Sequence, residues 1–126
     1  MTFKYDRLNI IPDSRGLVFE PLMADAFAHQ QNAHVVISMP GVVRGNHYHK
    51  KGVETVVIMG PALVRIREND RTEDIEIPED QAYRFVFSPG VSHAIQNQSN
   101  QPNILVAFNT VEHDPEKPDT VRDVLI

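Results

Sequence analysis

The sequence contains no cysteine. Disulfide bonds and thiolate metal sites are therefore excluded, and any bound metal must take its ligands from histidine, aspartate, glutamate or main-chain oxygen. Such nitrogen and oxygen ligands favour hard or borderline metal ions over soft ones.

The sequence also lacks a long apolar stretch. A membrane-spanning helix needs a run of about 20 apolar residues, and no such run occurs. The first seven residues, MTFKYDR, do not lead into the apolar region of about 7 to 15 residues that a signal peptide requires. We therefore expect a cytoplasmic protein that does not associate with a membrane.

Basic residues form no cluster. The 12 lysines and arginines are scattered along the chain and are outnumbered by 17 acidic residues, so the formal net charge is −5. Nucleic-acid binding depends on a concentrated positive surface. We therefore expect no nucleic-acid partner.

Helix-period patterns are equally scarce, and only residues 23–31 are moderately helical in pattern, a stretch that also fits a loop. Elsewhere, short segments rich in Val, Ile and Phe are separated by turn residues, including nine prolines and six glycines. This pattern is typical of an all-β sandwich or barrel. The expected strands are residues 3–11, 17–22, 33–39, 44–50, 54–59, 62–67, 72–77, 83–87, 93–98 and 104–109. Residues 113–120 are expected to be a surface extension.

A chain of 126 residues can form one hydrophobic core but not two, so we expect a single domain over residues 1–126. The number of short strands favours a double-stranded β-helix, a jelly roll of two antiparallel sheets. Residues 54–59, ETVVIM, are apolar on both strand faces after the first positions. Because such a strand and the edges of an open sandwich need cover, we expect a homodimer.

Two histidines separated by one residue suggest a metal site. Side chains alternate along a strand, so His47 and His49 point to the same side, with Cα atoms about 6.5–7 Å apart. Four residues then allow the chain to turn and return the carboxylate of Glu54 from the next strand. His93 follows the Pro-Gly turn at residues 89–90, which directs it inward.

A lone His-x-His pair is weak evidence, because a buried histidine usually just satisfies a hydrogen bond. The four residues in this order, with turn glycines between them, carry the prediction. We predict that His47, His49, Glu54 and His93 bind one divalent transition metal. Zinc is the first expectation, and nickel, iron or manganese suit the same ligands.

Two segments of the chain resemble the two sequence motifs of the cupin superfamily. The first is Gly41-x5-His47-x-His49-x4-Glu54-x5-Gly60, one residue shorter than usual before the final glycine, and the second is Pro89-Gly90-x2-His93-x3-Asn97. In cupins the three histidines and the glutamate are the metal ligands. The resemblance therefore implies a cupin jelly roll and the same four ligands.

A narrower resemblance covers most of the chain. Its segments are DSRG (residues 13–16), PGVVRGNHYH (40–49), SPGVSH (88–93) and HDPEKPDT (113–120). They are similar to the cupin domain of the bifunctional enzyme of UDP-N-acetyl-L-fucosamine biosynthesis, which epimerises C3 of a UDP-4-keto-6-deoxy sugar. The DSRG turn also resembles that of dTDP-sugar epimerases and ketoisomerases. Gly52 and Thr55 stand where lysines are expected, and we expect no reductase domain within these 126 residues.

The resemblance implies an enzyme with a small-molecule substrate, a nucleotide sugar. Epimerisation next to a ketone needs an acid and a base near the reacting carbon. The available candidates are His34, Tyr83 and Lys51, with Lys50 beside it, although none has a diagnostic spacing. His34 and Tyr83 also suit ordinary structural roles in a sheet.

A diphosphate is best bound by the forked donors of arginine. The candidates are Arg15 in the DSRG turn, Arg44 just before the histidines, and Arg65, with Arg67 behind them. A solvated surface charge is the structural alternative for each arginine.

Two other functions fit the same sequence. An iron or manganese cupin oxygenase is one, because four protein ligands leave two positions of an octahedral ion open. The other is a cupin that binds a sugar without catalysis, since one scaffold supports many chemistries.

Overall fold

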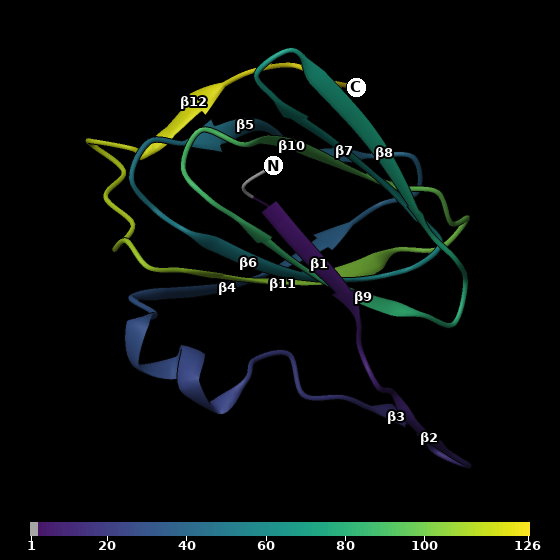
Figure 1. The fold of residues 1–126 in the computed structure, drawn as a ribbon. Helices are drawn as coiled ribbons and strands as arrows, with labels where there is room; N and C mark the ends of the chain where they lie inside the picture. The colour runs from purple at the N-terminus through teal and green to yellow at the C-terminus, as the bar shows by residue number, and fades with distance from the viewer. Residues whose placement is uncertain (1–2) are drawn as a thin grey trace.

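The computed structural model describes residues 3–126, which form two five-stranded antiparallel sheets packed face to face (Figure 1). One sheet has the strand order β1-β9-β6-β11-β4, and the other has β12-β5-β10-β7-β8. The strands are β1 (Phe3–Arg7), β2 (Ile11–Asp13), β3 (Gly16–Val18), β4 (Asn32–Ser38), β5 (Val43–His49), β6 (Glu54–Met59), β7 (Ala62–Glu68), β8 (Arg71–Ile77), β9 (Ala82–Phe87), β10 (Ser92–Asn97), β11 (Asn103–Asn109) and β12 (Thr120–Arg122).

The chain passes back and forth between the sheets from β4 to β11, apart from the β7–β8 hairpin, which stays in one sheet. This connectivity is that of a jelly roll. The fold is the cupin double-stranded β-helix, as the sequence predicted. The predicted single domain included residues 1 and 2, which lie outside the described residues.

The core lies between the sheets and follows the alternation of the strands. On β7, Ala62, Val64 and Ile66 are fully buried, whereas the residues between them are only partly covered. Val56 and Ile58 of β6 pack against the same cluster from the opposite sheet. The outward Val57 is also buried, in a second cluster with Leu8 and Ala82. The chain's own N-terminal segment therefore helps to cover the second face of β6.

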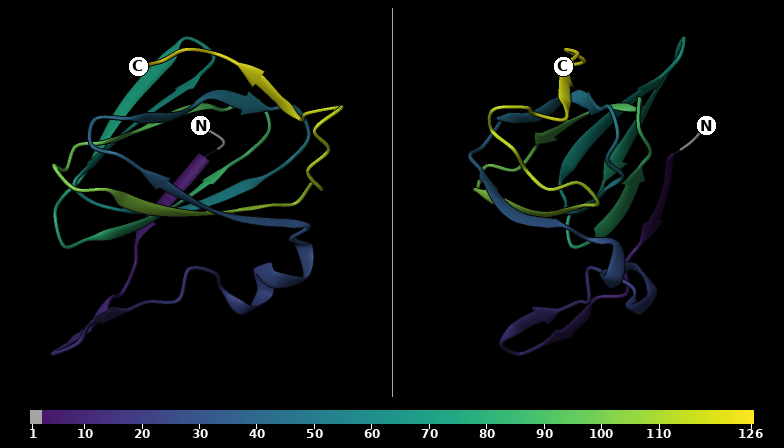
Figure 2. Two further views of the ribbon diagram at one scale, coloured as in Figure 1. Left: turned by 180° about the vertical axis from the view of Figure 1, so that it is seen from behind. Right: turned by 90° about the vertical axis from the view of Figure 1, so that its left-hand side faces the viewer.

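The N-terminal region differs from the prediction. The expected strand at residues 3–11 ends at Arg7. The next residue, Leu8, packs its side chain into the second cluster, and its N–H donates to the carbonyl of Ala82 at 2.7 Å. Residues 12 and 13, predicted to be part of a turn, belong to the β2–β3 hairpin. This hairpin projects from the barrel (Figure 2). A 3-10 helix, η1 (Ala24–His29), follows it within residues 23–31, for which the sequence left a short helix and a loop open.

The C-terminal segment adds a strand that the sequence pattern did not predict. After the irregular residues 113–119, β12 pairs with β5, so that Thr120 lies opposite His49 and Arg122 opposite His47. Asn46, which has a φ of 55°, accepts hydrogen bonds from the N–H groups of Leu125 and Ile126 through Oδ1. The end of the chain is thereby held against the outside of the sheet that carries the histidine pair. Among residues 3–126, no helix is long and apolar enough to cross a membrane.

Candidate metal centre

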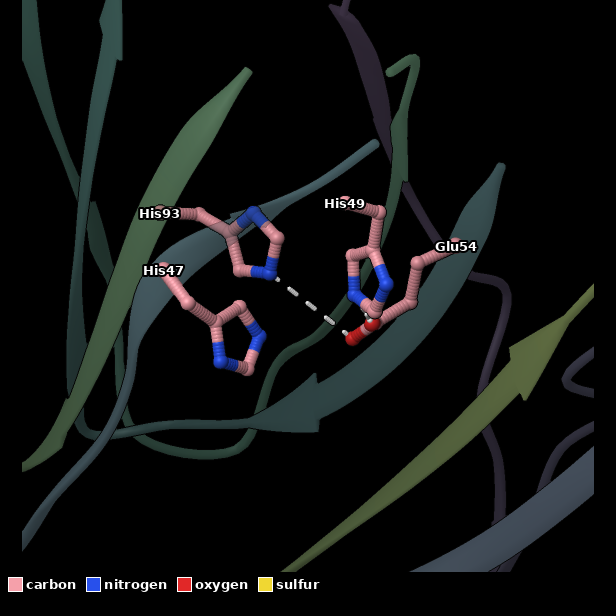
Figure 3. A group of neighbouring side chains, drawn as sticks. All are labelled: His47, His49, Glu54 and His93. Atoms are coloured by element: carbon pink, nitrogen blue, oxygen red, sulfur yellow. Dashed lines mark ion pairs between the residues drawn. The ribbon is translucent and has the colours of Figure 1, made fainter. Parts of the chain in front are cut away.

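Four ionisable side chains from three strands meet between the sheets (Figure 3). They are His47 and His49 of β5, Glu54 of β6 and His93 of β10. One ligand atom from each residue lies within 4.8 Å of the corresponding atoms of the others. The structure therefore brings together all four predicted metal ligands.

Strand alternation and sheet pairing explain this convergence. His47 and His49 are two residues apart on β5, so their side chains share its inner face. The antiparallel pairing of β10 with β5 places His93 opposite His47. Glu54 is the first residue of β6, in the other sheet, and reaches across the sandwich. The ring of Phe87 stacks on His93, with 4.1 Å between ring centroids.

The loop between His49 and Glu54 is held by hydrogen bonds from the C-terminal part of the chain. The carboxylate of Asp119 accepts the N–H of Lys51 at 3.1 Å and that of Gly52 at 2.8 Å. The hydroxyl of Thr110 accepts the N–H of Val53 at 3.0 Å. These contacts fix the path of the loop and therefore the position of Glu54, the first residue of the next strand, relative to His49.

The ring nitrogens have the arrangement that a metal requires. Nδ1 of His93 lies 3.0 Å from the carbonyl oxygen of Val91, which can only accept, so Nδ1 carries the proton and Nε2 has a free lone pair. Nε2 of His49 and Nε2 of His93 are buried without a hydrogen bond of acceptable geometry. Both face the carboxylate of Glu54, and these contacts would be ion pairs only if the rings were protonated. Buried polar atoms without partners are costly, and a bound cation would satisfy these two.

The protonation states also suit a metal. Burial lowers the pKa of His93 to about 4, and burial likewise lowers the pKa of His47. For Glu54, burial raises the pKa, but the interaction with His49 and the charges of the surrounding histidines outweigh it, so the pKa stays below its ordinary value. At neutral pH the site thus offers neutral imidazoles at residues 47 and 93 and an ionised carboxylate, the forms that bind a divalent metal.

The four residues line a cavity of about 480 Å³. Its walls include apolar side chains from both sheets, among them Val36, Ile95 and Leu105. The segment between β11 and β12 contributes Glu112, His113, Asp114, Pro118 and Asp119. A small organic molecule can therefore lie beside the four predicted ligands, with one wall of its cavity formed by the C-terminal segment.

Two of the other predicted site residues line this cavity. His34 on β4 does so, and its Nδ1 lies 3.0 Å from Oδ1 of Asn32. Arg44 on β5 also does so, donating to the carbonyl of Ile37 at 3.2 Å and to the hydroxyl of Ser38 at 3.4 Å. Both residues lie on strands that were expected from the sequence.

The remaining predicted site residues lie away from the cavity. Tyr83 packs against the main hydrophobic cluster and stacks on Tyr5, with ring centroids 6.1 Å apart. Lys51 is exposed on the loop before β6. Neither residue lines the cavity.

The arginines of the projecting hairpin and of β7 also lie away from the cavity. The side chain of Arg15 is 87% exposed in the β2–β3 hairpin and pairs with Asp13. Arg65 alternates with the buried residues of β7, so it faces outward, where Asp74 binds it through two oxygens at 2.7 and 2.8 Å. Strand alternation therefore excludes Arg65 from the interior.

Several cavity residues had no predicted role. Asn109 ends β11, and His113 and Asp119 belong to the segment that precedes β12. The only sequence signal for the last two was the HDPEKPDT segment, which resembles its counterpart in the fucosamine-pathway enzyme. Their positions depend on β12 pairing with β5.

Comparison with known protein families identifies the family of this chain. The family described as the polysaccharide biosynthesis C-terminal domain matches residues 11–121. The chain belongs to this family. A curated relative, the spore coat polysaccharide biosynthesis protein SpsL of Bacillus subtilis, is 28% identical over an alignment of 125 positions, and the match covers 87% of this chain and 80% of SpsL.

Solved structures share the fold. The capsular polysaccharide assembling protein CapF of Staphylococcus aureus superposes with a TM-score of 0.70 and 24% identity over 94% of this chain. This chain spans only 33% of CapF. ChmJ of Streptomyces bikiniensis, a 3'-monoepimerase solved in complex with dTDP-quinovose, has a TM-score of 0.76 and 17% identity, covering 95% of this chain and 68% of ChmJ. At these identities the similarity shows the cupin fold.

Proposed function

We propose that this chain is a metal-binding epimerase or isomerase that acts on a nucleotide-linked 4-keto-6-deoxy sugar. The convergence of three imidazoles and one carboxylate on the wall of a substrate-sized cavity carries this proposal. Membership of a polysaccharide biosynthesis family and the fold shared with ChmJ, which is named as an epimerase and holds a dTDP-sugar, support the substrate class.

The proposed reaction removes the proton on a carbon next to a ketone and returns a proton to it. A divalent metal held by His47, His49, Glu54 and His93 would stabilise the negative charge that develops on the ketone oxygen. Inversion needs separate acid and base groups. His34 from β4 and His113 from the C-terminal segment line the same cavity, and we propose them as this pair.

Arg44 lines the cavity, and its guanidinium group is the proposed ligand of the substrate's diphosphate. Its hydrogen bonds to Ser38 and Ile37 hold the side chain along the cavity wall. Because these bonds order the Arg44 side chain before the substrate binds, less conformational entropy is lost on binding.

The decisive experiment measures proton exchange. The metal-loaded protein is incubated in deuterium oxide with UDP- or dTDP-linked 4-keto-6-deoxy sugars, and the sugar is analysed by NMR and mass spectrometry. We expect deuterium at C3, with loss of exchange after chelation. Iron in the purified protein together with oxygen uptake that depends on substrate would contradict this function and favour the oxygenase.

A sugar-binding cupin without catalysis is the second candidate. The absence of a lysine at Gly52 and Thr55, beside the predicted ligands, favours it. Sugar binding with intact metal and no exchange at C3 would support this alternative.

We also propose that the chain forms a homodimer through β4 and β11. Val35 and Ile37 on β4, Met39 just after that strand and Ile104 on β11 are each more than half exposed. β4 is also the edge of its sheet, so its outer main-chain groups can pair with β4 of a second copy. The two-fold symmetric contact would cover an apolar face and an open edge together.

A further inference from the structure

Two polar side chains lie beside Nδ1 of His49, on the side of the ring away from the Glu54 carboxylate. Its Nδ1 lies 3.3 Å from Nδ2 of Asn109 and 3.7 Å from Oδ2 of Asp119. The side chains of His49 and Asp119 are 10% and 16% exposed, so water has little access to this contact. The hydrogen-bond partner of Nδ1 must therefore come from the protein itself.

Metal binding determines which kind of partner Nδ1 needs. If Nε2 of a neutral imidazole gives its lone pair to a metal, the proton must lie on Nδ1. Nδ1 then needs a hydrogen-bond acceptor. A histidine that binds a metal usually donates this second N–H to a carboxylate or a carbonyl oxygen, which fixes the ring and makes it a better ligand.

Asn109 does not supply that acceptor. Its Oδ1 accepts the main-chain N–H of Val111 at 2.8 Å, which turns its Nδ2, a donor, toward His49. Asp119 is the acceptor beside Nδ1. A charge-assisted hydrogen bond has a length of about 2.7–2.9 Å, so a movement of roughly 1 Å would form it.

The carboxylate of Asp119 is already oriented for this role. It accepts the N–H groups of Lys51 and Gly52, and its main-chain carbonyl accepts the N–H of Lys50 at 2.9 Å. The next residue, Thr120, pairs with His49 across β12 and β5. Asp119 is thus tied by main-chain and side-chain bonds to the segment that joins His49 to Glu54.

The residue at position 52 has to be small for these groups to approach. A Cβ atom on Gly52 would lie 2.3 Å from Oδ1 of Asn109 and 3.0 Å from Oδ2 of Asp119. The space in which a larger side chain would begin is occupied by the polar groups around His49. This is a physical reason for glycine at a position where the family resemblance leads one to expect lysine.

We propose that Asp119 is a positioning residue that accepts the Nδ1–H of His49 when Nε2 of that ring binds a metal, and that Gly52 provides the space for this contact. The inference rests on the proposed metal site and adds to it the group that holds one ligand in its metal-binding tautomer.

The test measures binding of zinc and cobalt to the full chain by competition with a chelator. Two-dimensional ¹H–¹⁵N NMR of the histidine rings reports which nitrogen of His49 carries the proton. We expect Asp119→Asn to weaken zinc affinity by about 10–100-fold and to alter the Nδ1 signal of His49 in the zinc-loaded protein. The absorption spectrum of bound cobalt should change as well.

Thr110→Val is the matched control, because it removes the other side-chain bond to the same loop without touching His49. A similar loss of affinity in Thr110→Val and Asp119→Asn, with an unchanged ring signal, would show that Asp119 only anchors the loop and would overturn the proposal. Wild-type affinity in Asp119→Asn would also overturn it. Failure of the wild-type protein to bind either metal would overturn the metal site as well.

Gly52→Ala tests the same contact independently, should Asp119→Asn fold poorly. Its added Cβ must displace Asn109 or Asp119. We expect a metal affinity at least several-fold weaker than wild type, with circular dichroism confirming the folded state. Unchanged affinity and an unchanged His49 signal in this variant would contradict the proposed role of Gly52.

Discussion

Gly45 on β5 lies so close to the main-chain carbonyl of His93 on β10 that a Cβ atom at position 45 would stand 2.7 Å from the carbonyl oxygen. The register between the two strands shifts at this point, between His93 and Ala94. Gly45 also has a φ of +88°, which other residues rarely adopt. A glycine in one strand therefore helps to set the position of a predicted ligand on its neighbour.

Gly45→Ala should destabilise the protein and weaken its metal binding. The unfavourable φ alone costs about 1–3 kcal/mol, and the contact with the His93 carbonyl must move β10. Urea unfolding and zinc titration measure the two effects. Gly41→Ala is the control, because Gly41 also has a positive φ, +77°, but a Cβ there would meet nothing within 4 Å. Equal zinc affinity in the two variants would contradict this account.

Zinc should stabilise the folded protein through the four predicted ligands. A metal that binds only the folded state adds about 2.7 kcal/mol at a concentration of 100 times Kd, or roughly 10 °C in melting temperature. Glu54→Gln should remove most of this shift, as measured by differential scanning calorimetry. Glu112→Gln, on the cavity wall, should retain it. An equal shift in both variants would place the metal elsewhere.

Without metal, stability should fall as the pH is lowered from about 6.5 toward 4. Burial lowers the pKa of His93 from 6.5 to about 4, so in this range the unfolded chain binds a proton that the folded chain does not. The neutral His93 ring therefore contributes fully to the free energy of unfolding above the unfolded-state pKa. This contribution is lost as the pH falls, by up to about 1.4 kcal/mol per pH unit for one proton. Urea unfolding in the presence of EDTA measures it. His93→Gln should flatten this dependence, and an unchanged pH dependence in that variant would contradict this account.

Arg44→Gln should weaken binding of a nucleotide sugar. Hydrogen bonds to charged groups contribute about 1.5–3 kcal/mol, so we expect Kd to rise roughly 10–100-fold in calorimetric titrations. Arg65→Gln, on the outside of the barrel, is the control and should bind like wild type. The opposite ranking of the two variants would exclude Arg44 as the diphosphate ligand.

Ile37→Lys should dissociate the proposed dimer, because it places a charge within the exposed apolar face of β4 and β11. Light scattering after gel filtration measures the mass. Val124→Lys changes an equally exposed apolar residue near the C-terminus and should leave the dimer intact. A monomeric wild-type protein at micromolar concentration would contradict the proposed assembly.

Local patterns were enough to predict most of the strands. The strands at residues 62–67 and 72–77 were expected because turn residues separate these two short segments, and the structure pairs them as the β7–β8 hairpin. The break after Arg7 could not be predicted locally, because it depends on Leu8 packing against Val57 and Ala82, which lie about 50 and 75 residues further along the chain. The pairing of β12 with β5 likewise involves a separation of about 70 residues.

The sequence by itself determined the chemical types of the predicted ligands and the common face of His47 and His49, because the absence of cysteine and the alternation of a strand are local properties. The order of the four residues and their turn glycines also predicted that Glu54 and His93 reach the same site, which the structure shows. Tertiary structure alone decided that Arg44 lines the cavity while Arg65 does not, and that Asp119 lies beside Nδ1 of His49. These outcomes depend on the order of strands in two sheets, and no short stretch of sequence encodes that order.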